Sequence, residues 1–308
     1  MYVGAIDIGG TKIAVGLVNE EGHIISKEIM PTSPEKGLSY SINRITQSLR
    51  GLQESTGASI AGIGISCTGP IDPINGELGI NAFLPGWEGM RLVESLVENF
   101  HLSIAMENDA DAAALAECRW GSGNNSESFL YLTVSTGIGS GLILNNRLYR
   151  GVNGAHPEMG HHTVDLNGPQ CFCGAKGCWE VMASGPAMTK WYLSQLPNNV
   201  KLPNDIDAYK ICELARANDF IAKRTIDREA NYLGIGLANL ITLFTPGYIS
   251  LGGGVMKSWD LFEEKVRNVI KSTCGLVPFE QTKISLSSLG TDVNLLGAGQ
   301  TWFHRFSK

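Results

Sequence analysis

The chain has 308 residues, of which 43% are hydrophobic and 18% charged, and its formal net charge is −6. This length allows two domains with cores of their own, and the composition is typical of a soluble globular protein. The acidic balance argues against a nucleic-acid surface, which needs concentrated Lys and Arg. The longest apolar run, residues 232–244, is too short to cross a membrane. We therefore expect neither a nucleic-acid nor a membrane partner.

Short apolar runs separated by glycine turns organise the first half of the chain. Residues 3–6 form a predicted strand that ends in a glycine-rich turn at residues 7–12. Residues 39–55 repeat apolar side chains at helical spacing, with Ile42, Ile45 and Leu49 on one face. The other elements predicted here are strands at 13–18, 23–28, 60–66 and 104–107 and helices at 92–99 and 110–119.

The same opening pattern returns in the second half. A predicted strand at residues 129–134 leads into a tight turn at 135–141 and a strand at 142–144. Residues 16–19 resemble residues 141–145, which indicates an internal duplication of a strand, glycine turn and strand. Two related α/β domains facing one cleft are therefore predicted. The remaining predicted elements are helices at 187–195, 208–218, 222–244 and 295–306 and a strand at 249–251.

One His and three Cys, namely His161, Cys171, Cys173 and Cys178, lie within eighteen residues and are interrupted by glycine and proline. Thiolate and imidazole ligands in a tetrahedral array favour Zn²⁺, and four protein ligands leave no open position, so the predicted zinc is structural. The alternative is that these cysteines are buried or disulfide-bonded. The odd total of 7 Cys, their clustering and the lack of a secretory signal favour a reducing cytoplasm.

The glycine turns could bind phosphate, because turns without Cβ atoms let backbone N–H groups approach phosphate oxygens. Thr11 and Thr136 add hydroxyl donors and Lys12 adds a cation, while Asp7 could hold a hydrated Mg²⁺. Residues 252–254 form a third such turn, which we expect to lead into a helix N-terminus. The alternative for any one of them is a simple tight hairpin. None matches a P-loop, and no Rossmann fingerprint follows the first strand.

Asn108 and Asp109 follow a predicted strand and precede a helix. Carboxylates at strand ends are where α/β proteins place their chemistry, so Asp109 could accept a hydroxyl proton as that oxygen attacks phosphorus. The alternative is that Asp109 or Asp111 caps the helix. Three candidate phosphate-binding turns and a polar segment fixed by the predicted metal occur in the same chain, which favours the catalytic interpretation.

These motifs, taken together and in order, resemble the ROK family of repressors, open reading frames and kinases. The resemblance covers nearly the whole chain, and the cysteine motif is its most specific part. It implies the actin-like ATPase, or ribonuclease H-like, fold, with two duplicated α/β domains around a nucleotide cleft. We expect one domain from residues 1–112 with the helix at 293–308, and the other, with the zinc knot at 158–180, from residues 113–292.

The resemblance implies an ATP-dependent sugar kinase in which Asp109 is the general base. The residues that it implies for sugar binding are Asn81, Asn108, Asp109, Glu158, His161 and Glu180. His161 would also bind zinc, and Asn81 has the alternative of lying in an ordinary loop. The residues that it implies for ATP and Mg²⁺ are Asp7, Gly9, Gly10, Thr11, Lys12, Thr136, Gly137, Gly253 and Gly254.

Glucose phosphorylated at its 6-hydroxyl is the expected reaction. N-acetylmannosamine, N-acetylglucosamine and fructose stay open as substrates, because His156 and Pro157 depart from many members and occur in a fructokinase-like branch, whereas the cysteine segment keeps the glucokinase-like form. A non-catalytic sugar-sensing regulator is the alternative of another class. Such repressors carry about 60–80 residues of DNA-binding domain before the first glycine turn, which begins here at residue 7. A homodimer is usual among relatives and is expected.

Overall fold

The structure is a computed structural model that describes residues 1–197 and 206–307. The chain divides into two compact units. Unit 1 comprises Met1–Glu127, Gly141–Pro157 and Ser288–Lys308, and unit 2 comprises Ser128–Ser140 and Glu158–Ser287. The sequence-based boundaries differ from this division, because residues 113–127, 141–157 and 288–292 belong to unit 1. None of the helices in the described ranges is both long and apolar enough to cross a membrane.

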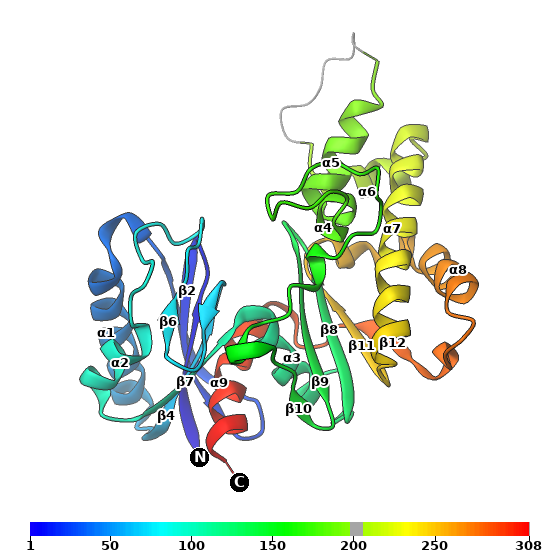
Figure 1. Ribbon diagram of the computed structural model, residues 1–308. Helices are drawn as coiled ribbons and strands as arrows, with labels where there is room; N and C mark the ends of the chain where they lie inside the picture. The colour runs from blue at the N-terminus through cyan, green and yellow to red at the C-terminus, as the bar shows by residue number, and fades with distance from the viewer. Residues whose placement is uncertain (198–205, 308) are drawn as a thin grey trace. The chain divides into compact units, whose positions relative to one another are not determined.

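A five-stranded mixed sheet in the order β3-β2-β1-β4-β7 forms the centre of unit 1 (Figure 1). Strand β1 is antiparallel to β2 and parallel to β4, which is parallel to β7. The strands of this sheet are β1 (Tyr2–Ile8), β2 (Lys12–Asn19), β3 (Ile24–Pro31), β4 (Ile60–Cys67) and β7 (Ser103–Asn108). A separate two-stranded ribbon pairs β5 (Ile71–Asp72) with β6 (Glu77–Leu78).

Both faces of this sheet are covered, which explains why its strands read as nearly continuous apolar runs. Alternate residues of β1 enter two cores: Ile6 and Ile8 join the core under α1 (Leu38–Thr56) and α2 (Leu92–Phe100). Val3 and Ala5 join the core under the helix α9 (Val293–Phe306), which lies on the other face beside α3 (Asp109–Trp120). This period of two is the one that a strand imposes.

Glycine allows α9 to lie directly on the sheet. A Cβ at Gly64 in β4 would overlap the carbonyl of Ala298, and one at Gly62 would overlap the indole of Trp302. The Trp302 indole N–H donates to Ser103 Oγ at 2.9 Å. The C-terminal helix is therefore an integral layer of unit 1.

The second five-stranded sheet has the order β10-β9-β8-β11-β12, the same topology as the first, as duplication predicts. Its strands are β8 (Ser128–Val134), β9 (Ile138–Leu144), β10 (Arg147–Leu148), β11 (Tyr248–Gly252) and β12 (Lys283–Leu286). The division between the units passes through β9. The helices of unit 2 are α4 (Trp179–Ala183), α5 (Gly185–Ser194), α6 (Ala208–Arg216), α7 (Phe220–Phe244) and α8 (Glu263–Thr273).

Helix α7 is the central support of unit 2, since α4, α5, α6 and α8 all pack on it. Its closest approach to α4 is at Gly236, where an added Cβ would overlap the buried Trp179 indole. Trp179 lies between Cys178 and Glu180 in the chain, so this contact ties both predicted functional residues to the longest helix of the unit.

Candidate functional site

In unit 1, the predicted acidic residues lie at the carboxyl ends of two parallel strands, β1 and β7, which flank β4. Asp7 of β1 is paired with Ser66 of β4, and Asn108 ends β7 in register with Cys67. The Ser66 hydroxyl donates to Asp7 Oδ1 at 2.9 Å. Asp109 follows directly as the first residue of α3. Parallel pairing thus places Asp7, Asn108 and Asp109 at one edge of the sheet.

Asn108 caps α3, and its Oδ1 accepts the Ala110 N–H at 2.9 Å. Asp109 Oδ1 accepts the same N–H at 2.8 Å. The capping alternative considered for Asp109 therefore describes part of its geometry, although Asn108 occupies the cap position itself. Asn108 is buried and Asp109 is partly exposed.

The electrostatic environment of Asp7 is unusual. Burial raises the pKa of Asp7 to about 7, the hydrogen bond from Ser66 opposes that rise, and the neighbouring negative charge of Asp109 adds to it. Lys12, just after the turn, lowers the pKa by a smaller amount. A bound cation would favour the ionised form of Asp7 in the same way.

The turn at residues 9–12 is closed by a hydrogen bond from Gly9 N–H to Lys12 O at 3.0 Å, and Thr11 O accepts the Thr32 N–H at 3.1 Å. Gly10 faces Phe83, since an added Cβ would lie 2.8 Å from the Phe83 Cβ. The amide of Asn81 is engaged within its own loop: it donates to Thr68 O at 2.9 Å and accepts from Phe83 N–H at 2.8 Å. Asn81 thus fixes the loop that lies over Gly10.

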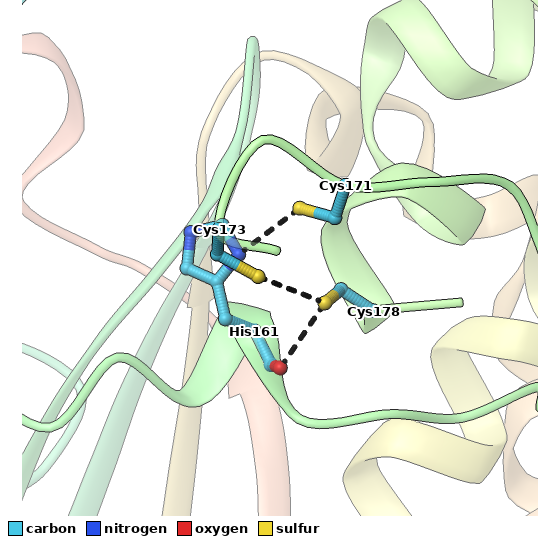
Figure 2. Close-up of side chains that lie close together, drawn as sticks. All are labelled: His161, Cys171, Cys173 and Cys178. Carbon is cyan, nitrogen blue, oxygen red and sulfur yellow. Dashed lines mark hydrogen bonds between the residues drawn. The ribbon is translucent and has the colours of Figure 1, made fainter. Parts of the chain in front are cut away.

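In unit 2, the predicted metal ligands converge (Figure 2). One donor atom from each of His161, Cys171, Cys173 and Cys178 lies within 4.8 Å of the others. His161 Nδ1 is 3.4 Å from Cys171 Sγ, and the Sγ atoms of Cys173 and Cys178 are 3.4 Å apart. These four residues are the only such metal-competent group among the residues that the structure describes.

The spacing and chemistry of this cluster fit zinc. A Zn²⁺ ion about 2.3 Å from each sulfur in a tetrahedral array separates neighbouring ligand atoms by roughly 3.5–3.8 Å. The side chains therefore need to move only slightly to enclose the ion. The backbone N–H of Ala175 lowers the pKa of Cys173, which favours the thiolate, whereas burial raises the pKa of Cys178 to about 12. Zinc would deprotonate both thiols.

Glycine makes the fold of this segment possible. Gly177 has φ +61°, and an added Cβ would overlap the Asp165 carbonyl oxygen. Gly174 has φ +97°, and the tight turn around it is closed by Cys171 N–H donating to Ala175 O at 2.8 Å. The bond brings the three cysteines to one side of the loop, from which they face His161 (Figure 2).

The two predicted sugar-binding glutamates differ in their surroundings. Glu180 Oε2 accepts the Ile138 N–H at 3.0 Å, and an added Cβ at Gly137 would overlap that oxygen. Glu158 is exposed, and its backbone O accepts the His161 N–H at 3.0 Å. Glu180 therefore lies against the turn after β8, and Glu158 caps the short 3-10 helix that ends at His161.

The predicted nucleotide turns lie side by side in unit 2, because β8 and β11 are parallel neighbours and Thr133 pairs with Gly252. Gly253 has φ +92°, and an added Cβ would overlap the Val134 carbonyl. Gly254 caps a 3-10 helix, Val255–Leu261, in place of the expected α-helix start. Thr136 is exposed between these turns.

The predicted site residues thus form two groups, one in each unit. The group in unit 1 is Asp7, Gly9, Gly10, Thr11, Lys12, Asn81, Asn108 and Asp109. The group in unit 2 is Thr136, Gly137, Glu158, His161, Cys171, Cys173, Cys178, Glu180, Gly253 and Gly254. Sequence reasoning missed Ser66, whose position at the end of the predicted strand 60–66 was the available signal. It also missed the pairs Arg150–Glu107 and His156–Asp111.

Comparison with known proteins identifies the family. The model described as "ROK family" matches residues 3–305. A glucokinase of Thermotoga maritima is 31% identical over 306 residues, covering 95% of this chain and 94% of that protein. A xylose repressor of Bacillus subtilis is 33% identical over 301 residues, covering 96% of this chain and 75% of the repressor.

Solved structures agree in fold. A ROK hexokinase from Thermus thermophilus has a TM-score of 0.84 and 35% identity, with 98% of this chain and 97% of that one covered. A ROK family glucokinase from Streptomyces griseus, in complex with glucose and AMPPNP, has a TM-score of 0.79 and 30% identity, with 97% and 98% covered. The two mixed α/β sheets therefore have the actin-like ATPase fold, and the chain belongs to the ROK family.

Proposed function

We propose that this protein is an ATP-dependent hexose kinase, with glucose phosphorylated at its 6-hydroxyl as the first substrate to test. The observation that carries the proposal is that two acidic residues, Asp7 and Asp109, lie at the carboxyl ends of parallel strands of unit 1. Burial raises the pKa of Asp7, and the charge of Asp109 adds to that rise. A proton acceptor beside a carboxylate suited to a cation is the arrangement that phosphoryl transfer to an alcohol requires.

Asp109 would take the proton of the sugar hydroxyl as that oxygen forms a bond to the γ-phosphorus of ATP and ADP departs. Asn108, whose cap geometry fixes the start of α3, would orient the sugar. Asp7 and the N–H groups of the turn at residues 9–12 would hold the Mg²⁺ and phosphate end of ATP. Positioning and charge neutralisation carry most of such catalysis.

In unit 2, Glu158, His161 and Glu180 would bind sugar hydroxyls, and the turns at Gly137 and Gly253 would receive the nucleotide. Zinc, bound by His161 Nδ1 and three thiolates, would supply a closed structural centre and no reactive position. Since Nδ1 faces the thiols, Nε2 of His161 is the nitrogen left for a sugar hydroxyl. The Streptomyces griseus glucokinase was solved in complex with glucose and AMPPNP, which supports a site for a sugar and a nucleotide in this chain.

The test is a coupled assay of ADP release with ATP, Mg²⁺ and a panel of hexoses and N-acetylhexosamines. We expect turnover with at least one sugar. Asp109→Asn should lower kcat on the order of 10²–10⁴-fold while sugar binding, measured by calorimetry, stays near that of the wild type. Near-normal turnover in Asp109→Asn would remove Asp109 from the base role, and no turnover with any sugar would refute the proposal.

A sugar-sensing regulator is the second candidate, because the xylose repressor of Bacillus subtilis is as similar as the glucokinases. The same panel separates the two functions. Sugar binding by calorimetry without any ADP release would favour the regulator. N-acetylmannosamine, N-acetylglucosamine or fructose as preferred substrate would change the sugar and leave the kinase assignment intact.

A further inference from the structure

Two buried acidic side chains flank the site residues Asn108 and Asp109, and both are held by one segment of the chain. Glu107 precedes the pair at the end of β7, and Asp111 follows it in the first turn of α3. Arg150 forms an ion pair with Glu107, and His156 contacts Asp111. All of these residues belong to unit 1.

The contacts are specific. Two guanidinium nitrogens of Arg150 donate to the two carboxylate oxygens of Glu107, a bidentate geometry that fixes orientation as well as distance. His156 Nδ1 is 2.8 Å from Asp111 Oδ2. The side chain of Asp111 is only 2% exposed, and its Oδ1 has no hydrogen-bond partner among the described residues. The His156 contact is therefore important for holding this carboxylate.

The backbone explains why one segment reaches both acids. The Gly151 N–H donates to Ala155 O at 2.8 Å, which closes a small loop between Arg150 and His156. Inside it, Gly154 has φ +76°, and an added Cβ would lie 2.9 Å from Ile74 Cδ1, so the loop is anchored on the ribbon region of unit 1. Closure of this loop places Arg150 and His156 beside each other, facing opposite ends of the same turn.

Charge supports the same arrangement. Burial raises the pKa of Glu107 to about 7, and the bonded Arg150 is the main influence that lowers it. Arg305 adds a smaller favourable charge, while Asp111 raises the pKa further. Burial lowers the pKa of Arg150, but the hydrogen bonds and charge of Glu107 and the charge of Asp111 raise it above its usual value. Because two acidic groups lie near one guanidinium, loss of Arg150 would leave like charges facing each other in a buried place.

We propose that Arg150 and His156 are positioning residues that clamp the β7–α3 turn from both sides and so set the position of Asp109. Its catalytic consequence rests on the proposed kinase function, whereas the clamp itself is a property of the fold. Asp111 lies two residues after Asp109 in the same helical turn, so a release of Asp111 moves the base. A misplacement of about 1 Å can cost on the order of 10² in rate.

The first experiment measures steady-state kinetics of His156→Ala, His156→Asn and Arg150→Lys. We expect His156→Ala to lower kcat by about 10–100-fold with the KM for sugar changed less than about twofold, since only the transition state needs the placed base. His156→Asn, whose amide can replace the Nδ1 donor, should recover most of the loss. Arg150→Lys keeps the positive charge but loses the bidentate hydrogen bonding, so its kcat should lie between those of the wild type and His156→Ala.

The matched control is Arg147→Met, an exposed arginine of the same segment, which should keep wild-type kcat and wild-type thermal unfolding. For the kinetic comparison, the thermal unfolding midpoint of His156→Ala must also lie within a few degrees of the wild-type midpoint. If His156→Ala does not fold, the kcat values of His156→Asn and Arg150→Lys test the proposal instead. Wild-type kcat in His156→Ala or in Arg150→Lys would overturn the proposal.

The second experiment does not depend on activity. The Ala110 N–H is bonded to both Asn108 and Asp109, so its hydrogen exchange reports on the turn. We expect this amide to exchange at least about tenfold faster in His156→Ala than in the wild type and Arg147→Met. Unchanged exchange refutes the clamp. A wild type that lacks kinase activity refutes the proposed function instead, and the exchange result then decides the clamp alone.

Discussion

Glu229 is a buried carboxyl group in the centre of unit 2, and replacing it with methionine should stabilise the protein. Its side chain is 0% exposed on α7, and neither carboxyl oxygen has a hydrogen-bond partner in the described part of the chain. Burial raises the pKa of Glu229 well above its usual range, and Arg228 opposes this only in part. Methionine has a similar length and no oxygen to desolvate.

The magnitude follows from two terms. Removing an unsatisfied buried polar group gains about 1–3 kcal/mol at any pH. The second term depends on pH: below the ordinary glutamate pKa both states are protonated, but above it the unfolded chain ionises while the folded Glu229 stays neutral. The wild type therefore loses stability relative to Glu229→Met by about 1.4 kcal/mol per pH unit, until the raised folded pKa is reached.

Urea unfolding at pH 5, 6 and 7 measures this difference. We expect the stability gap between Glu229→Met and the wild type to widen by about 1.4 kcal/mol from pH 5 to pH 6. Glu264→Met, the same change at an exposed position of α8, should show no such widening. A gap that is constant with pH, or a less stable Glu229→Met at pH 7, would refute the reasoning.

Two further predictions concern the two site groups. Burial raises the pKa of Asp7 to about 7, so Asp7 is protonated below that pH. The affinity for Mg·ATP, measured by calorimetry, should therefore rise as the pH increases from 6 to 8. Asp7→Asn should bind Mg·ATP weakly and without this rise, and an equal rise in the variant would contradict the assignment. Cys173→Ser should lower the zinc content, measured by elemental analysis, together with thermal stability and sugar affinity. Cys118→Ser, outside the cluster, should keep all three. A zinc-free protein with full stability and sugar affinity would contradict a structural metal.

The strands and helices were largely predictable because their signals are local. Apolar alternation in β1 and helical spacing in α1 each reflect the face that packs on a core. The four metal-competent residues were predictable for the same reason, since short spacing in sequence forces closeness in space. The small strands β5, β6, β10 and β12 were missed, because four residues or fewer carry no readable period.

Contacts between distant segments could not be predicted from one sequence. Nothing near Arg150 or His156 indicates that their partners are Glu107 and Asp111, about forty residues earlier. Residues 141–157 also belong to unit 1, which their place in the sequence did not indicate. Sugar binding by Asn81 stays a prediction, and the structure adds the bonds of its amide to Thr68 and Phe83. Which polar side chains are left for a ligand is decided by tertiary structure.

The place of α9 in unit 1 determines the order in which the chain can mature on the ribosome. The core between the first sheet and α9 needs Leu295, Trp302 and Phe303, which are synthesised after all of unit 2. Unit 2 ends at Ser287, so all of its residues are synthesised before those of α9. Because domains fold as units during synthesis, the later part of the chain can complete its fold first. Unit 1 must then wait, with part of one face of its sheet uncovered, until α9 has been synthesised.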